Sequence, residues 1–308
     1  MSQLHQTQRN GSGSRGATIL TKSTRRIPSD PGLAVISGGS SGIGLACAAE
    51  LLDRGCRVAL LARDAGRLAR ARDALVAARP GSHVLVRSVD VGDSEACRDA
   101  VSSLIAVEGA PEWVVASAGI AQPGLFLEQD LAEHERHIHI NYLGALHLLH
   151  SCTPSMAQRG RGHIVLVSSS AALAGIYGYS AYAPSKFALR GLGEVLRVEL
   201  AECGVKVTVA CPSDTDTPQY HGEQVFRPAV TKVISQGGGL WQPTTVARAI
   251  IAAAEKGRFL VGPGIGAWLL ANFGGLAGSI LRHRQIRLAR AMGPDARKGV
   301  RGGGPAEQ

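Results

Sequence analysis

Short apolar runs alternate with longer segments of helical periodicity in the middle of this 308-residue chain. The runs predict seven strands, at residues 33–37, 57–62, 83–88, 113–117, 163–168, 205–211 and 258–261. They are nearly continuous rather than alternating, which is typical of strands that helices cover on both faces. Because a helical segment separates each pair, we predict an α/β fold with one doubly wound, parallel, seven-stranded sheet and helices on both faces.

The periodic pattern also divides the chain into regions. Residues 1–31 are polar, basic and aperiodic, which predicts a disordered tail. The pattern then predicts one catalytic domain at 32–262, an extension at 263–292 that is first apolar and then basic, and a second disordered tail at 293–308. Ligands of a doubly wound sheet bind at the carboxyl ends of its strands, so functional motifs are expected there.

The net charge of +9 comes entirely from the two ends of the chain. Residues 1–30 carry +4 and residues 282–308 carry +5, while the segment between them is neutral. A nucleic-acid-binding protein would place basic residues on the folded body, so we expect no nucleic-acid partner. The basic ends favour either weak attraction to an anionic membrane surface or a role in solubility alone.

The cysteines and the N-terminal segment both bear on the cellular compartment. The six cysteines show no CxxC spacing and mostly fall in apolar segments, which predicts buried free thiols in a reducing compartment. No continuous apolar segment precedes Gly32, so no secretory signal is expected. We therefore expect a cytoplasmic protein, either free or peripheral on the inner face of a membrane.

A glycine-rich turn directly follows the first predicted strand and opens a helix. Glycine at such a turn allows close approach of a pyrophosphate, and the helix N-terminus offers free N–H groups to it. This context predicts a Rossmann-like dinucleotide site rather than a purely structural turn. The candidate binding residues are Gly38, Ser40, Ser41, Gly42, Ile43 and Gly44.

The next two strand ends indicate which dinucleotide binds. The second strand ends at Arg63 with Arg67 one helical turn later, where an acidic residue would instead favour NAD(H). An arginine at this position accommodates a 2′-phosphate, so NADPH/NADP+ is the predicted cofactor. Asp90 follows the third strand and could accept a hydrogen bond from the adenine amino group, or cap the next helix.

Ser169, Tyr182 and Lys186 form the candidate catalytic set. Ser169 follows the fifth strand, and the four-residue spacing places Tyr182 and Lys186 on one face of the next helix. An ammonium beside a phenol stabilises the phenolate. Tyr182 could then protonate an alkoxide as hydride arrives, with Ser169 polarising the carbonyl and Lys186 also holding the nicotinamide ribose. A tyrosine that merely packs in a helix is the structural alternative.

These motifs, together with Asn141, resemble the short-chain dehydrogenase/reductase family over residues 32–262. The resemblance implies that Asn141 holds a water chain linked to Lys186, and that Pro212, Thr215 and Thr217 close over the nicotinamide and pyrophosphate. It also makes Ser168 a second candidate for the carbonyl-polarising hydroxyl. In many relatives the helices that carry Asn141 and Tyr182 form a dimer face, so a homodimer or homotetramer is expected.

Residues 141–144, 185–192 and above all 212–218 are similar to the 3-ketodihydrosphingosine reductase branch of this family. The resemblance implies NADPH-dependent reduction of 3-dehydrosphinganine to sphinganine, with another apolar ketone (steroid, retinoid or acyl chain) as the alternative substrate. Three positions depart from the family pattern. Ser37 replaces threonine, Ala116 replaces the first asparagine of Asn-Asn-Ala-Gly, and Ser213 replaces glycine.

The alternative from another functional class is a non-catalytic, nucleotide-sensing protein. A nucleotide-sensing relative would usually lack the tyrosine or the lysine, and this chain keeps both. No metal site is expected, because no cysteine or carboxylate completes a ligand set with the histidines of the Asn141 helix. Those histidines are His134, His137, His139, His147 and His150.

One uncharged segment remains, from residue 259 to residue 281, directly before a basic cluster. Its 23 residues could nominally span a bilayer, but six glycines and Pro263 interrupt it. We expect the part at 265–281 to lie on a membrane surface or to roof the substrate channel. Packing on the domain and a true membrane span are the alternatives.

Overall fold

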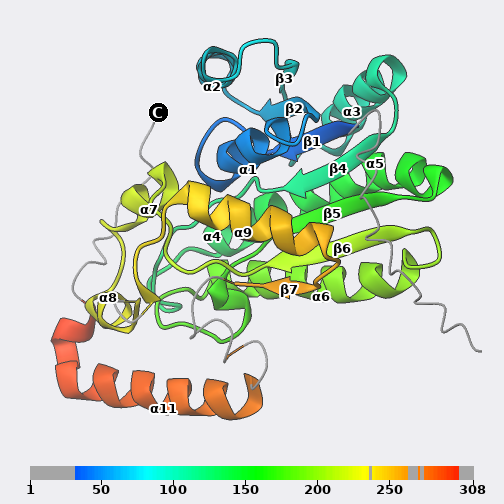
Figure 1. Cartoon of the computed structure of the whole chain (residues 1–308). Coiled ribbons are helices and arrows are strands. Elements are labelled where there is room, and N and C mark those ends of the chain that lie inside the picture. Colours follow the sequence, from blue (N-terminus) through cyan, green and yellow to red (C-terminus); the bar gives the residue numbers. More distant parts are fainter. Residues whose placement is uncertain (1–31, 236–237, 263–269, 271–273, 298–308) are drawn as a thin grey trace, which may run out of the picture.

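The computed structural model describes residues 32–235, 238–262, 270 and 274–297. Its core is one parallel sheet with the strand order β3-β2-β1-β4-β5-β6-β7, which confirms the predicted doubly wound fold (Figure 1). The strands are β1 (Leu33–Ser37), β2 (Arg57–Ala62), β3 (Val84–Ser88), β4 (Pro111–Ala116), β5 (Gly162–Val167), β6 (Val205–Ala210) and β7 (Leu260–Val261). The last is shorter than predicted.

Two apolar layers cover the sheet, and alternate residues of each strand point into opposite layers. In β1, Ala34 and Ile36 join the layer of α1, α2 and α9, whereas Leu33 and Val35 join the layer of α3, α5 and α6. These helices are α1 (Gly42–Leu52), α2 (Ala65–Ala78), α3 (Ser94–Glu108), α5 (Gly144–Arg159), α6 (Tyr182–Glu199) and α9 (Pro243–Glu255). Burial on both faces explains why the strands lack polar alternation.

A π-helical turn, η1 (His139–Leu143), joins α4 (Leu131–Ile138) to α5. It carries Asn141, which is completely buried. Single π turns inside long helices are frequent at functional sites, because the extra residue re-aims a side chain. Here the turn directs Asn141 at the first turn of α6, where it bonds the Ser185 hydroxyl.

Two short helices, α7 (Pro218–Glu223) and α8 (Ala229–Ser235), follow the end of β6. The chain then returns through α9 and β7 to α11 (Gly274–Met292), which lies along one edge of the molecule close to α8 (Figure 1). None of the helices in the described part of the chain is both long and apolar enough to cross a bilayer. Apart from residue 270, the apolar segment 263–273 and the tail 1–31 lie outside the described residues.

The end of the chain differs from the expectation of a disordered tail from residue 293. A 3-10 turn, η4 (Gly293–Arg297), follows α11 and contacts α8, with Ala296 buried. Burial of this methyl group between the two helices offsets the conformational entropy of ordering the turn. The cysteines are free as predicted, and all are buried except Cys203, which is partly buried.

Candidate active site

Three glycines of the turn between β1 and α1 occupy positions where a side chain would be strained or would clash. Gly38 and Gly42 have φ angles of 67° and 56°, in the left-handed region that favours glycine. A Cβ on Gly38 would lie 2.7 Å from the Ala118 nitrogen, and one on Gly44 would lie 2.4 Å from the Gly38 oxygen. The Ser41 side chain makes no capping hydrogen bond to the N-terminus of α1. This cradle fits a pyrophosphate group.

Ser37, at the end of β1, shows why this position requires a hydroxyl group. Its hydroxyl accepts hydrogen bonds from the backbone nitrogens of Ser117 and Ala118, both at 3.2 Å. The bonds tie the start of the glycine-rich turn to the end of β4. The replacement of threonine by serine therefore keeps the hydroxyl group that this junction uses.

Arg63 and Asp90 lie together at the carboxyl ends of β2 and β3, with Arg63 Nη1 3.9 Å from Asp90 Oδ2. The Asp90 Oδ1 atom accepts a hydrogen bond from the Gly92 nitrogen at 2.9 Å. The residue that caps α3 is Asp93, so the alternative that Asp90 is the helix cap is wrong. The Asp90 carboxylate instead lies beside Arg63, where a bound adenosine would be expected.

Arg67 lies in the first turn of α2, close to the same strand end. Its backbone nitrogen donates to the Asp64 side chain at 2.8 Å, and its Nε atom lies 3.4 Å from Asp64 Oδ2. The Arg67 and Arg63 side chains are both largely exposed. Two guanidinium groups are therefore accessible where a 2′-phosphate would lie.

Tyr182 begins α6 and is buried close to the end of β5. Burial raises the pKa of the Tyr182 phenol, and a hydrogen bond with the Ser169 side chain acts in the opposite direction. The phenol is therefore neutral near pH 7, and its O–H can donate a proton. Ser169 is placed at this hydroxyl by a 3-10 turn, η2 (Ser170–Ala172), which it caps by accepting from the Ala171 nitrogen at 3.1 Å.

Lys186 lies one helical turn after Tyr182 and is almost completely buried. Its Nζ atom donates to the Val167 oxygen at 3.0 Å and lies 5.7 Å from the centre of the Tyr182 ring. Burial lowers the pKa of Lys186 to about 8. The ammonium is thus mostly protonated at pH 7, where it favours negative charge on nearby groups.

Asn141 connects the loop after β4 to α6. Its Oδ1 atom accepts from the Ile120 nitrogen at 2.8 Å, and its Nδ2 atom donates to the Ile120 oxygen and to the Ser185 hydroxyl. A Cβ on Gly119 would lie 3.0 Å from Asn141 Oδ1 and 3.3 Å from Lys186 Nζ. The Asn141 amide and the Lys186 ammonium therefore lie around the same small space beside Gly119.

Ser168 and Ser169, the two candidate hydroxyls, have different surroundings. The Ser168 hydroxyl is buried and donates to the Lys186 backbone oxygen at 2.9 Å. The Ser169 side chain instead bonds the Tyr182 phenol. The geometry thus places Ser169 at the phenol and uses Ser168 to hold α6 against β5.

Three residues after β6 were predicted to close over the cofactor. The Pro212 oxygen accepts from the Ser170 nitrogen at 2.9 Å, which links the ends of β5 and β6. Thr215 is buried, and Thr217 caps α7 through its hydroxyl. A Cβ on Gly42 would lie 3.1 Å from the Thr217 methyl group, so Thr217 lies directly against the glycine-rich turn.

A buried ionic cluster beside the phenol was not expected from the sequence. Arg227 donates to Asp214 at 2.6 and 3.0 Å and also to Glu223, which in turn bonds the Tyr179 hydroxyl. Burial raises the pKa of Glu223 to about 7, and Arg227 opposes this shift. The Tyr179 ring lies 5.4 Å from the Tyr182 ring. The four-residue spacing of Glu223 and Arg227 was the one signal in the sequence that could have indicated this ion pair.

His137 is buried and lies 6.3 Å from the Tyr182 ring, centre to centre. Its Nδ1 atom lies 2.6 Å from the Glu133 oxygen, and its Nε2 atom accepts from the Gln122 nitrogen at 3.0 Å. Burial lowers the pKa of His137. Both ring nitrogens are used by the backbone, and the described residues contain no group of three metal-ligating side chains.

Two curated relatives are similar in sequence to most of this chain. A 3-dehydrosphinganine reductase of Danio rerio is 36% identical over 240 residues, 77% of this chain and 72% of the relative. A 3-ketodihydrosphingosine reductase of Bos taurus is 35% identical over 241 residues, 77% of this chain and 73% of the relative.

Solved structures show the same fold. Levodione reductase superimposes with a TM-score of 0.72 and 21% identity, over 79% of this chain and 99% of the other. An NADPH-bound short chain oxidoreductase of Pseudomonas aeruginosa superimposes with a TM-score of 0.68 and 26% identity, over 76% and 96%. The sequence profile described as short chain dehydrogenase matches residues 32–224. The chain therefore belongs to the short-chain dehydrogenase family of oxidoreductases.

Proposed function

We propose that this protein uses NADPH to reduce a ketone to a secondary alcohol, and that its substrate is 3-dehydrosphinganine. The observation that carries the reaction type is the Tyr182 phenol, which is hydrogen-bonded to Ser169 and has the Lys186 ammonium one helical turn away. The relatives named 3-dehydrosphinganine reductase support the substrate, because they align over 77% of this chain at 36% identity. A different apolar ketone is the alternative.

The side chains divide the reaction between them. Bound NADPH supplies the hydride that adds to the carbonyl carbon. Ser169 donates a hydrogen bond to the carbonyl oxygen, and Tyr182 transfers its proton to that oxygen as negative charge develops there. Lys186 stabilises the resulting phenolate and holds the nicotinamide ribose. Asn141 positions α6 through Ser185 and holds a water chain that returns a proton toward Lys186.

In this proposal, residues at the carboxyl ends of the strands bind the cofactor. The cradle of Gly38, Ser40, Ser41, Gly42, Ile43 and Gly44 holds the pyrophosphate, closed by Pro212, Thr215 and Thr217. Arg63 and Arg67 bind the 2′-phosphate, and Asp90 accepts from the adenine amino group. Ser168 supports this site indirectly, because its hydroxyl bonds the Lys186 backbone oxygen in α6.

The substrate assignment is tested by NADPH oxidation with three ketones, namely 3-dehydrosphinganine, a ketosteroid and a short β-keto ester. We expect kcat/KM to be highest for 3-dehydrosphinganine, with sphinganine as the identified product. A higher kcat/KM for either other ketone would contradict the substrate, and no oxidation with any ketone would contradict the reaction type.

The C-terminal helix supports a peripheral location on an anionic membrane. Helix α11 exposes Leu276 and Ile280, and the same helix carries Arg284 and Arg287. Apolar side chains next to cations combine insertion with electrostatic attraction. We expect sedimentation with anionic vesicles at low salt and release at high salt. Protein that stays in the supernatant with every vesicle would contradict this location.

A second copy of the chain is a further proposed partner. Helix α6 exposes Val195 and Val198, which would lose apolar contact with water in a homodimer or homotetramer. Light scattering on purified protein should give twice or four times the chain mass of 32.0 kDa. A mass of one chain at all concentrations would contradict it.

A further inference from the structure

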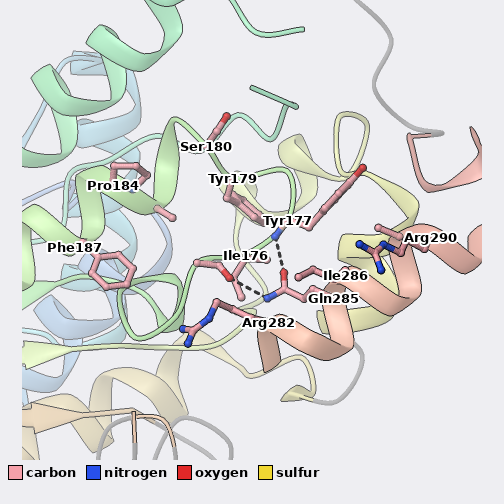
Figure 2. Close-up of a pocket in the computed structure, with 13 residues that line it drawn as sticks. Ile176, Tyr177, Tyr179, Ser180, Pro184, Phe187, Arg282, Gln285, Ile286 and Arg290 are labelled. Carbon is pink, nitrogen blue, oxygen red and sulfur yellow. Dashed lines mark hydrogen bonds between the residues drawn. The ribbon is translucent and has the colours of Figure 1, made fainter. Parts of the chain in front are cut away.

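A groove of about 770 Å³ lies between the start of α6 and the C-terminal helix α11. In Figure 2, Phe187 and Pro184 form one wall, Gln285, Ile286 and Arg290 form the opposite wall, and Tyr179 and Ile176 lie between them. This volume is within the range of pockets that bind small molecules. Helix α11 therefore does not pack flush against the domain but encloses a space beside it.

Two polar side chains of the groove, Gln285 and Ser180, have partners within the chain. The Gln285 amide donates to the Gly175 oxygen at 3.0 Å and accepts from the Tyr177 nitrogen at 2.7 Å. The Ser180 hydroxyl lies within hydrogen-bonding distance of Gln129 Oε1 and the Gly124 oxygen. The two Gln285 bonds hold α11 against the loop before α6.

Apart from Gln285 and Ser180, the groove is lined mostly by apolar side-chain atoms. Ile176, Ala183, Phe187, Ile286 and Ala289 line the groove and offer no polar group. Arg282 and Arg290, both exposed, are the charged residues of the lining. Their aliphatic stems can cover apolar surface while the guanidinium groups stay in water. The lining therefore favours an apolar ligand over a polar one.

The groove adjoins the apolar cluster that contains the Tyr182 ring, although Tyr182 itself does not line the groove. Tyr179, Ala183 and Ile176 line the groove and belong to the same small apolar cluster as Tyr182. Ala183 is the next residue after Tyr182 in α6. A molecule with its reactive carbonyl at Tyr182 would therefore extend an apolar tail past Tyr179 and Ala183 to reach the groove.

We propose that this groove binds the alkyl chain of the ketone substrate, with α11 as its outer wall. The inference rests on the proposed function, and it adds a function for the C-terminal helix, which lies beyond the matched family region 32–224. The chain binds through removal of methylenes from water, so the groove selects substrates by chain length and not by a polar tail group.

The test compares ketones that share the 3-dehydrosphinganine head group and differ in chain length, each assayed as a monomer in water below its critical micelle concentration. For the unmodified protein, kcat/KM should rise roughly fourfold for each methylene that enters the groove. Ala289→Trp fills the groove and should abolish this rise while leaving the shortest ketone nearly unaffected. Ala291→Trp is the matched control, because Ala291 lines a separate hollow with Ile280 and Arg287.

A second variant tests the opposite wall. Phe187→Ala removes a ring that lines the groove from α6, and it should lower kcat/KM roughly tenfold for long-chain ketones only, since a phenyl ring covers several methylenes. Equal losses for all chain lengths in Ala289→Trp and Phe187→Ala would overturn the proposal. So would a Phe187→Ala protein that keeps full selectivity for long chains.

A fluorescent alkyl probe that lacks a ketone tests alkyl binding in the groove separately from ketone reduction. N-Dodecyldansylamide should bind the unmodified protein and Ala291→Trp, with a rise in fluorescence, but not Ala289→Trp. If no ketone is reduced at any chain length, the proposed function fails, and this probe alone then decides on the groove. Probe binding that Ala289→Trp blocks supports an alkyl-binding groove, whereas equal binding to all variants, or to none, overturns it.

Discussion

Arg227 is the residue whose loss should most strongly destabilise the region around the phenol. Its side chain is 3% exposed, and its guanidinium bonds two carboxylates, those of Asp214 and Glu223. Arg227→Met keeps the length and apolar volume of the side chain but removes the positive charge. Both carboxylates would then lie beside the active site without their partner.

The structure sets the size of the effect. Removing one partner from a buried ion pair typically costs about 3–5 kcal/mol, because the remaining charge is uncompensated. Two features reduce the loss here. Asp214 is 23% exposed and can be hydrated, and the Arg227 Nε atom is buried with no hydrogen-bond partner, so its removal relieves a penalty. We therefore expect a loss of about 3 kcal/mol at neutral pH.

The loss should depend on pH in a defined direction. Burial already raises the pKa of Glu223 to about 7, above its ordinary value of 4.5 in an unfolded chain, and loss of Arg227 would raise it further. A carboxyl group with a raised pKa stabilises the folded state when protonated, and this stability is lost as pH rises through the folded-state pKa. The Arg227→Met variant should therefore be closer in stability to the unmodified protein at pH 5 than at pH 8.

Urea unfolding of the cofactor-free protein at both pH values measures this difference. Arg98→Met is the control, because Arg98 pairs with Asp99 on the surface of α3 and should change stability by less than about 0.5 kcal/mol. A loss below about 1 kcal/mol in Arg227→Met, or a loss that grows toward pH 5, would contradict a stabilising ion pair at Arg227.

Three further changes test the cofactor cradle and the proton donor. Arg63→Ala should weaken NADPH binding by about 2 kcal/mol and leave NADH binding unchanged, measured by fluorescence titration; equal losses for both cofactors would contradict the 2′-phosphate contact. Gly38→Ala should cost more than about 1 kcal/mol in urea unfolding, since φ is positive and Ala118 lies too close, and stability equal to that of the unmodified protein would be contrary to the described turn. Ketone reduction in a single turnover should slow as pH rises through about 8, where Lys186 loses its proton, and a rate that is flat to pH 10 would argue against a role for the ammonium.

The fold was largely predictable because its signal is local. Strands buried on both faces require apolar runs, and all seven runs match the observed strands to within two residues at each end. The run at 258–261 loses half of its predicted length, since only Leu260 and Val261 pair with β6. Edge strands make fewer contacts, so their length depends on the neighbouring strand more than on their own sequence.

Motifs with fixed spacing could also be predicted from the sequence, whereas contacts between distant segments could not. The glycine-rich turn and the Tyr182–Lys186 pair lie within single stretches of chain, and their chemistry follows from spacing. The contacts of Gln285 with Gly175 and Tyr177 join segments more than 100 residues apart. No periodicity in either segment indicates the other, so the groove that they enclose could not be predicted.

The central claim is that Tyr182 protonates a ketone that NADPH reduces at this site. Its most direct test is NADPH oxidation with 3-dehydrosphinganine in a single turnover, comparing the unmodified protein with Tyr182→Phe after both are saturated with NADPH. The account predicts sphinganine formation by the unmodified protein and a rate at least roughly 1000-fold lower in Tyr182→Phe, with NADPH binding unchanged. An equal rate of reduction in the two proteins would contradict it.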